Sequence, residues 1–203
     1  SSNADNTNLT SNNIYNNTYA NIFLCGASKT NIKSNIINAS SLGIAIGDYN
    51  STITCGGSAT ESNKTTISDN IINNTSGWDI YITNLTNSLF KNPVAFSINN
   101  SLNKTKINVT TNGTLYNQYY LDVLVQDTSS NPINAANVNA TDSGTYTSLN
   151  PTKGFNATTN STGYVPQQTL TEFMANATNT TPATFFYFNN YTVNASKSGY
   201  TTN

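Results

Sequence analysis

The chain has 203 residues, which is enough for one large domain or two ordinary domains with a buried core. Only 8% of the residues are charged, against about 25% in a typical globular protein, and the formal net charge is −1. The eight lysines form no cluster and there is no arginine or histidine, which excludes a nucleic-acid-binding basic patch and a Ser-His nucleophile. No stretch approaches the roughly 20 apolar residues of a membrane-spanning helix.

Amides and hydroxyls take the place of the missing charges, since the chain contains 38 asparagines and 55 serines and threonines. A polar composition is common in disordered chains, but those have few β-branched and aromatic residues. Here isoleucine, valine, tyrosine and phenylalanine are plentiful and periodically placed. The composition therefore predicts a folded, all-β protein.

One short phrase recurs in the first half of the chain: an aliphatic residue, two polar residues, an asparagine and further aliphatic residues. Its asparagines are 23, 35 and 22 residues apart. A repeat of this length with alternating apolar positions predicts a β-solenoid in which each repeat forms one coil. Each coil is expected to carry two short strands, one with the asparagine phrase and one with an Ile-x-Ile phrase. The asparagine phrases are residues 9–14, 32–37, 67–72 and 89–94.

The recurring asparagines are expected to stack at the turns between strands. Coils spaced like paired strands would put these side chains about 4.8 Å apart, where each can bond the amides of its neighbours. Such a ladder satisfies polar groups that the turns would otherwise bury unpaired. The less favoured alternative is that these asparagines bind a ligand. The predicted structural ladder consists of Asn12, Asn35, Asn70 and Asn92.

The two cysteines, Cys25 and Cys55, are predicted to form a disulfide. Cys25 follows an apolar triplet, and Cys55 lies in a turn-rich insertion at 54–63 that makes the second repeat longer. The bond would close a loop of about 30 residues and stabilise the fold by roughly 3–4 kcal/mol. Two buried free thiols are the alternative, and a metal site is less favoured because neither histidine nor a carboxylate cluster accompanies the cysteines.

The Asn-x-Ser/Thr sequon for N-glycosylation occurs 19 times. A random arrangement of this composition gives about 10 sequons, so chance explains about half of them. The excess and the predicted disulfide favour a secreted, heavily glycosylated protein. Because Asn73 and Asn74 are adjacent, both are not expected to carry a glycan at once. The predicted glycosylation sites are Asn8, Asn16, Asn38, Asn50, Asn63, Asn73 (or Asn74), Asn84, Asn99, Asn103, Asn108, Asn112, Asn139, Asn156, Asn160, Asn176, Asn179, Asn190 and Asn194.

The repeat pattern resembles the right-handed parallel β-helix of NosD-like and archaeal adhesin-like surface proteins. The resemblance covers about residues 5–100 and depends mainly on the Asn-Ile-Ile-Asn phrases at 35–38 and 70–73. It implies the fold more strongly than the function, because the same coil serves lyases, hydrolases, adhesins and surface-layer proteins.

The second part of the chain resembles a carboxypeptidase-regulatory-like domain, an Ig-like β-sandwich. The resemblance covers about 118–203 and lies in an alternating strand at 119–125, a turn at 127–132 and two Gly-Tyr turns, at 163–164 and 199–200. Such modules are usually spacers or contact surfaces. The sequence thus predicts a β-helix domain at 1–115 and an Ig-like domain at 116–203.

In that family a further strand normally follows the second Gly-Tyr turn, whereas this sequence stops at Asn203. No capping element is evident before Leu9. Open strand edges invite pairing with another chain. Either the sequence is a piece of a longer polypeptide, which is the favoured reading, or each copy completes its neighbour by strand addition.

Clustered catalytic groups are not evident, so an enzyme is not expected. Asp48 and Asp69 are the nearest approach to a carboxylate pair, but solvated turn residues are the favoured interpretation. Asp127 and Asp142 offer oxygen ligands for calcium, although neither lies in an EF-hand-like run, and no cofactor is expected. A stripe of Tyr15, Tyr19, Tyr49 and Trp78 would suit carbohydrate, but packing or subunit contact is favoured.

Together these patterns predict an extracellular structural glycoprotein, archaeal by resemblance, that assembles with copies of itself into a surface layer, sheath or filament. No nucleic-acid partner and no membrane span are expected. The alternative is a surface adhesin that binds carbohydrate or another cell.

Overall fold

The computed structural model of the protein describes residues 6–25, 27–38, 40–47, 64–83, 94–178, 183–188 and 190–200. Strands, turns and loops make up nearly all of this part of the chain, with two short 3₁₀ helices, η1 and η2. The predicted all-β class is confirmed. No helix among the described residues is long and apolar enough to cross a membrane.

The chain divides into two compact units. Unit 1 comprises Ser1–Asn117 and Met174–Phe185, and unit 2 comprises Gln118–Phe173 and Phe186–Asn203. The sequence placed one boundary after residue 115 and did not anticipate that the chain returns to the first unit. Three strands contain residues of both units: β12 (Thr114–Leu121), β15 (Gln168–Asn176) and β16 (Thr184–Tyr187).

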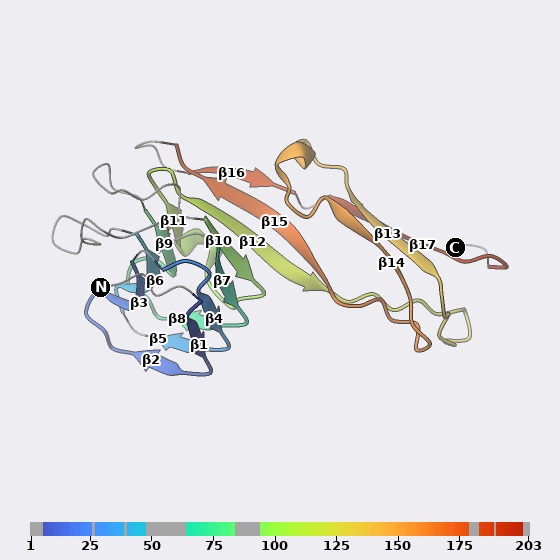
Figure 1. Ribbon diagram of the computed structural model, residues 1–203, viewed down its shortest axis with the longest axis horizontal. Coiled ribbons are helices and arrows are strands. Elements are labelled where there is room, and N and C mark those ends of the chain that lie inside the picture. Colours follow the sequence, from blue (N-terminus) through green and yellow to red (C-terminus); the bar gives the residue numbers. More distant parts are fainter. Residues whose placement is uncertain are drawn as a thin grey trace. The chain divides into compact units, whose positions relative to one another are not determined.

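Three sheets of unit 1 are built from strands that recur along the chain (Figure 1). One has the order β1-β4-β7-β10 and continues with β12-β15-β16, the second is β2-β5-β8, and the third is β3-β6-β9-β11. The chain therefore passes through the three sheets in turn, and each strand pairs in parallel with its counterpart in the next repeat. The strands are β1 (Asn8–Thr10), β2 (Asn13–Tyr15), β3 (Ala20–Leu24), β4 (Asn31–Lys33), β5 (Ile36–Asn38), β6 (Leu42–Ile46), β7 (Thr65–Ser68), β8 (Ile71–Asn73), β9 (Ile80–Ile82), β10 (Val94–Ile98) and β11 (Ile107–Val109).

Aliphatic side chains stack in columns through the interior of these repeats. The parallel register places equivalent residues of successive repeats opposite one another, and their alternation along each strand points them to one face. Burying each such side chain contributes about 1.5–3 kcal/mol. The columns are Leu9-Ile32-Ile67, Ile14-Ile37-Ile72, Ile22-Ile44-Ile80-Ile107 and Leu24-Ile46-Ile82-Val109.

Each of the first three asparagine phrases forms two strands that meet at a corner, and not the single strand that the sequence predicted; of the fourth, 89–94, residues 89–93 lie outside the described residues. The residue before the ladder asparagine has a positive φ, of 57° at Ser11, 55° at Ser34 and 56° at Asp69. This left-handed conformation bends the backbone between β1 and β2 and at the same place in the next repeats. Short polar side chains occupy it at less cost than β-branched residues would.

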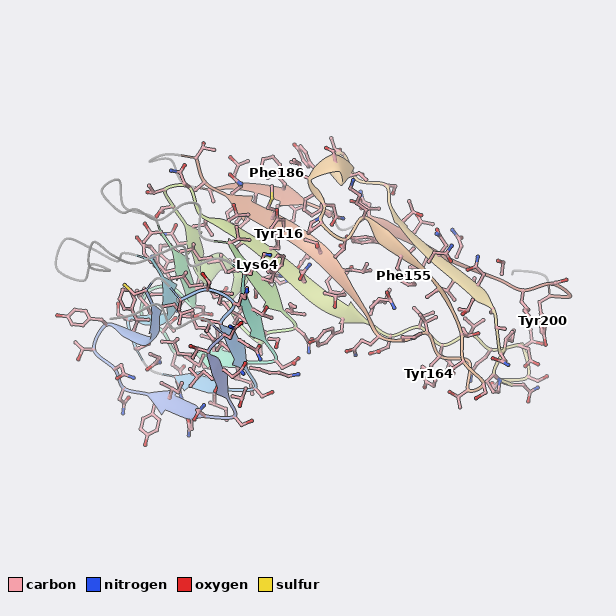
Figure 2. The ribbon with its side chains drawn as sticks, in the orientation of Figure 1. Lys64, Tyr116, Phe155, Tyr164, Phe186 and Tyr200 are labelled. Atoms are coloured by element: carbon pink, nitrogen blue, oxygen red, sulfur yellow. The ribbon has the colours of Figure 1, made fainter. Side chains whose placement is uncertain are left out.

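The fourth repeat is less regular than the others. It begins with β10 and ends with β11, but opposite β8 the described chain forms only an isolated bridge between Ile71 and Ser101. The 3₁₀ helix η1 (Lys104–Lys106) leads into β11. Phe96 of β10 stacks on Tyr116 of β12 with ring centroids 5.3 Å apart, and Tyr116 is labelled in Figure 2.

Unit 2 contains a sheet of the order β14-β13-β17, in which both pairings are antiparallel. Val138 and Phe188 are fully buried and Phe173 nearly so. The strand predicted at 119–125 lies earlier in the chain: β12 spans Thr114–Leu121, and beyond it an isolated bridge joins Leu124 to Tyr164. The elements are β13 (Asn137–Asp142), η2 (Thr147–Leu149), β14 (Gly154–Thr158) and β17 (Tyr191–Ser196).

Substitutions at two glycines with positive φ can measure the cost of the left-handed backbone conformation apart from the cost of a steric clash. Gly47 has φ +91° and an added Cβ would lie 1.8 Å from the Thr83 carbonyl oxygen, whereas Gly199 has φ +86° and no atom within 4 Å. Gly199→Ala is expected to lower the free energy of unfolding by about 1 kcal/mol. Gly47→Ala should cost about 3 kcal/mol or more. Urea denaturation measures both, and equal losses would contradict the close approach at Gly47.

Candidate functional site

Asn12, Asn35, Asn70 and Asn100 form a hydrogen-bonded column, the asparagine ladder. The Oδ1 atom of each later rung accepts two bonds from the rung before it, one from the backbone N–H and one from Nδ2. These distances are 2.9 and 3.1 Å from Asn12 to Asn35, 2.9 and 2.9 Å from Asn35 to Asn70, and 2.9 and 2.9 Å from Asn70 to Asn100.

Each later rung also bonds to the main chain of the repeat before it. Asn35 Nδ2 donates to the Leu9 carbonyl oxygen at 2.9 Å, and Asn70 Nδ2 donates to that of Ile32 at 2.9 Å. Asn35 and Asn70 are each 1% exposed. A buried carboxamide that uses its oxygen and both N–H groups leaves no polar group of the corner unpaired.

The fourth rung is Asn100, not Asn92 as the sequence suggested. The register of β10 on β7 sets Ile98 opposite Ser68, and Asn100 consequently reaches the level of Asn70. The aliphatic position of the phrase is here Ser97, which is fully buried and whose Oγ accepts from Asn100 Nδ2 at 3.1 Å. A search for an aliphatic residue three places before the asparagine therefore missed this rung. Asn92 lies outside the described residues.

The ladder is open at its first rung. Among the described residues, none donates a hydrogen bond to Asn12 Oδ1, and Asn12 Nδ2 turns to the Thr10 carbonyl oxygen of its own strand at 2.9 Å. β1, β2 and β3 all end the strand orders of their sheets. Leu9 and Ile14 are only half-buried here, although the residues next in their columns are fully buried. This end of unit 1, the first-repeat edge, thus offers backbone groups, one carboxamide acceptor and apolar surface.

Aromatic side chains add to the first-repeat edge. Tyr15 is 59% exposed and Tyr19 is 58% exposed, and both had been considered for a carbohydrate stripe. Trp78, another member of that stripe, is 37% exposed and belongs to the third repeat. Tyr49 lies outside the described residues.

In the described part of unit 2, β14 and β17 are the outer strands of their sheet. β17 ends the sheet β14-β13-β17, and its Val193 is 42% exposed. A groove of about 460 Å³ lies beside the end of β17, lined by Val125, Ile133, Ala195 and Tyr200 among others. Polar side chains, among them Gln126, Asp127 and Lys197, line the groove together with these apolar ones. A groove of this kind beside the outer strand of a sheet is a suitable seat for a further extended segment.

Comparisons with known proteins give no assignment. No protein-family model, curated protein or solved structure matches the chain. The function has to be argued from the geometry alone.

The asparagines divide cleanly by burial. Of the described sequon asparagines none is buried; they are exposed or half-buried. The buried asparagines are Asn35, Asn70, Asn117 and Asn150, and no sequon begins at any of them. The predicted sites Asn50, Asn63, Asn84 and Asn179 lie outside the described residues.

Cys25 is disulfide-bonded, and no described cysteine is free. Its predicted partner, Cys55, lies outside the described residues. The pairing of these two cysteines stays a prediction.

The acids considered for catalysis have structural partners. Asp69 accepts from Asn99 Nδ2 at 3.0 Å and pairs with Lys33 at 3.7 Å, while Asp48 lies outside the described residues. A further acid of unit 1, Asp79, is 3% exposed and accepts from the Thr75 hydroxyl with one oxygen and from the Asn103 N–H with the other. In the described part of the chain, no group of three His, Cys, Asp or Glu residues is arranged to hold a metal.

The two acids considered as calcium ligands, Asp142 and Asp127, each accept hydrogen bonds from their own set of donors. Both Asp142 oxygens are engaged, one by the Gly144 N–H at 2.8 Å and the other by Asn150 Nδ2 at 2.7 Å. Asp127 closes the turn at 127–131, and its carboxylate accepts from Asn131 Nδ2 at 3.0 Å and from the N–H groups of Asn131 and Ser129. The bonds from Asn131 hold the pKa of Asp127 below its ordinary value of 3.8.

The Asp127 turn gives a prediction for pH. Because the folded-state pKa is depressed, these bonds stabilise the turn above the ordinary carboxyl pKa and are lost as the pH falls through the folded value. Asn131→Ala removes the side-chain donor and should raise the pKa of Asp127 toward its ordinary value. NMR titration of the carboxyl carbon measures it, with Ser129→Ala as the control that keeps its backbone donor. An unchanged midpoint in Asn131→Ala would contradict this assignment.

The ladder gives a prediction for stability. Asn70→Ala leaves the Asn35 N–H and the Ile32 carbonyl oxygen without their partners, and is expected to lower the free energy of unfolding by about 3 kcal/mol or more. Asn12→Ala is the matched control, because this rung is exposed and its Oδ1 accepts from no described residue; it should cost about 1 kcal/mol or less. Chemical denaturation measures the difference. Similar losses of unfolding free energy in the two variants would mean that the inner rungs stabilise the fold no more than the first rung does.

Proposed function

We propose that the protein is an extracellular structural glycoprotein whose copies assemble into a surface layer, sheath or filament. The observation that carries the proposal is the first-repeat edge, where three parallel sheets end together beside the open acceptor of Asn12. Unpaired strand edges are templates for another chain, and proteins that stay monomeric usually blunt them with charges, proline or a covering element. β1, β2 and β3 contain neither a charged residue nor a proline.

In this proposal unit 1 is a short parallel β-helix and unit 2 an Ig-like sandwich. The passage of the chain through three sheets in turn, with stacked isoleucines and asparagines, supports the first assignment. The antiparallel sheet β14-β13-β17 supports the second. A β-helix of this kind would supply a stiff body, and the edge strands of both units would supply the contacts between copies, joined by strand addition.

The distribution of asparagines supports the extracellular location. Sequons fall on exposed and half-buried positions, whereas the buried asparagines carry structural hydrogen bonds. N-linked glycans on the exposed positions would hydrate the surface and shield it from proteases. The scarcity of charge would make contacts between copies insensitive to salt and pH, since few charges are available to be screened or titrated.

An adhesin is the second candidate, and one cleft favours it. This cleft has a volume of about 390 Å³ and is lined by Asn73, Asn74, Ser101, Asp79 and Lys106, among others. Amides, hydroxyls and one charge of each sign are groups that hydrogen-bond sugar hydroxyls. An adhesin would act through this patch on a single copy, without forming a polymer.

Electron microscopy of the native material, extracted without denaturant, tests assembly. Regular filaments, tubes or sheets are expected, because the free edges of one copy would be completed by another. Discrete single particles would contradict self-assembly and favour the adhesin.

A charge at the first-repeat edge tests the surface itself. The double variant Tyr15→Lys, Tyr19→Lys should abolish assembly, since charged side chains block edge pairing, while changing the free energy of unfolding of a single copy by no more than about 0.5 kcal/mol. Tyr164→Lys is the matched control, because Tyr164 is 47% exposed but lies in a turn of unit 2. If the double variant still assembled, the copies would have to be joined through another edge.

A further inference from the structure

Two sequon asparagines, Asn103 and Asn160, share a pattern of hydrogen bonds with their own threonines. Asn103 Oδ1 accepts from the N–H of Thr105 at 3.0 Å and from its hydroxyl at 2.8 Å. Asn160 Oδ1 accepts from the N–H of Thr162 at 2.9 Å and from its hydroxyl at 2.7 Å. In both, Nδ2, the atom that would carry a glycan, donates to no described residue and the side chain is exposed.

Both residues lie in turns and not in strands. Asn103 caps η1, and its N–H donates to Asp79 Oδ2 at 2.7 Å. Asn160 opens a tight turn in which Gly163, at φ +79°, donates to the Asn160 carbonyl oxygen at 3.0 Å. This is the turn next to Tyr164, which Figure 2 labels. A turn at the surface can enter another enzyme's site without breaking a sheet.

Other sequons use Nδ2 within the fold. Asn74 Nδ2 donates to Asn38 Oδ1 at 2.9 Å, Asn99 Nδ2 donates to Asp69 Oδ1 at 3.0 Å, and Asn176 Nδ2 donates to Thr114 Oγ1 at 3.2 Å. Modification of these nitrogens in the folded chain requires the bonds to be broken first.

The sequon at Asn139 is restricted for a different reason. It lies in β13, between β14 and β17, and directly opposite two further sequon asparagines, Asn156 and Asn194. Opposed residues of neighbouring strands have Cβ atoms only about 4.5–5.5 Å apart, so glycans on all three would crowd one another. The central strand also has backbone bonds on both sides that fix it in place.

We propose that Asn103 and Asn160 are preferred acceptor sites at which the already folded chain takes up N-linked glycans. The proposal rests on the extracellular glycoprotein function above and deepens it by ranking the sites. The donor class is an oligosaccharide linked to a polyprenyl phosphate or pyrophosphate. A bond forms between Nδ2 and the anomeric carbon, the bond from that carbon to the lipid phosphate oxygen breaks, Nδ2 gives one proton to a base of the transferase, and the lipid phosphate leaves as an anion.

The turn geometry favours transfer because the carboxamide is already held in one orientation with its nitrogen outward. Ordering a mobile asparagine in a transferase site costs conformational entropy, and a preformed turn has met part of that cost on folding. A site within a strand adds the cost of breaking the backbone hydrogen bonds between paired strands. The fold therefore sets an order among sequons that are equivalent in sequence.

Glycosylation of the folded chain in vitro tests this order. The protein is made in a host without N-glycosylation, then incubated with an oligosaccharyltransferase and its lipid-linked oligosaccharide, and glycopeptides are followed by mass spectrometry. Asn103 and Asn160 are expected to be modified at least about tenfold faster than Asn74, Asn99, Asn139 and Asn176. In short synthetic peptides with the same sequons the difference should shrink to about twofold, since the fold is gone. Equal rates in the folded chain, or slower modification of Asn103 and Asn160, would overturn the proposal.

Asn150 offers a matched control for the free nitrogen. Its Oδ1 accepts from the N–H and hydroxyl of Thr152 at 3.0 and 2.9 Å, as in the two proposed sites, but Asn150 is 1% exposed. Its Nδ2 donates to Asp142 Oδ2 at 2.7 Å and to the Tyr191 hydroxyl at 2.6 Å. Pro151→Ala completes a sequon there and should leave Asn150 unmodified in the folded chain. Rapid modification of Asn150 would show that a free nitrogen is not needed.

Glycan occupancy in the native protein distinguishes failure of the proposed function from failure of the proposed order of sites. Native material without glycan at any site would contradict the proposed extracellular glycoprotein, while the in vitro order of sites would still decide the present proposal. Native glycans at many sites, with no preference for turns in vitro, would leave the proposed function standing and remove the ranking.

Discussion

The repeats of unit 1 depend on the asparagine ladder. At each corner the backbone leaves one sheet before it enters the next, so its N–H and C=O groups need hydrogen-bond partners outside the sheets. Asn35 lies between two repeats: its Oδ1 accepts from the Asn12 N–H of the repeat before it, and its Nδ2 donates to Asn70 Oδ1 of the repeat after it. A carboxamide does both, whereas a carboxylate accepts only and a hydroxyl has one proton. The length of the side chain also matters, since the Oδ1 atoms meet N–H groups at 2.9 Å with the columns of isoleucine in register. The ladder thus fixes the register on which the burial of those isoleucines depends.

The ladder has a direction, and this bears on the proposed assembly. Every step between rungs runs from donors on the earlier rung to an acceptor on the later one, so the first rung presents an acceptor that no described residue occupies. Two first-repeat edges placed face to face would bring acceptor to acceptor and gain no bond there. A partner that bonds this acceptor through N–H groups of a different surface would make the contact heterologous. Heterologous contacts generate rings or open filaments, in contrast to the closed dimers of self-complementary patches.

The sequence predicted the features of unit 1 that repeat and missed those that do not. Asn12, Asn35 and Asn70, with the inner isoleucines, follow from period and alternation alone. Asn100 was not predicted as a rung because Ser97 replaces the aliphatic residue of the phrase. A buried serine is acceptable there because Asn100 Nδ2 donates a hydrogen bond to its hydroxyl oxygen. The corner at Ser11, Ser34 and Asp69 was missed because a left-handed residue in a polar pair leaves no mark in the hydrophobic pattern. The return of Met174–Phe185 to unit 1 could not be read from local sequence, since it depends on which of several available edges β15 joins.

In the proposed glycoprotein asparagine would serve two incompatible purposes, and the alternation of the strands would keep them apart. A glycan on a ladder rung would consume the nitrogen that joins the repeats, so a rung has to be barred from modification. The residue two places after each of the first three rungs is Ile14, Ile37 or Ile72, the members of one inner column. Because that position points into the core, it is aliphatic, and an aliphatic residue there leaves the sequon incomplete. Leu102 stands at the same place after Asn100. The requirement for a buried aliphatic side chain at this position would therefore protect the ladder from glycosylation without any further device.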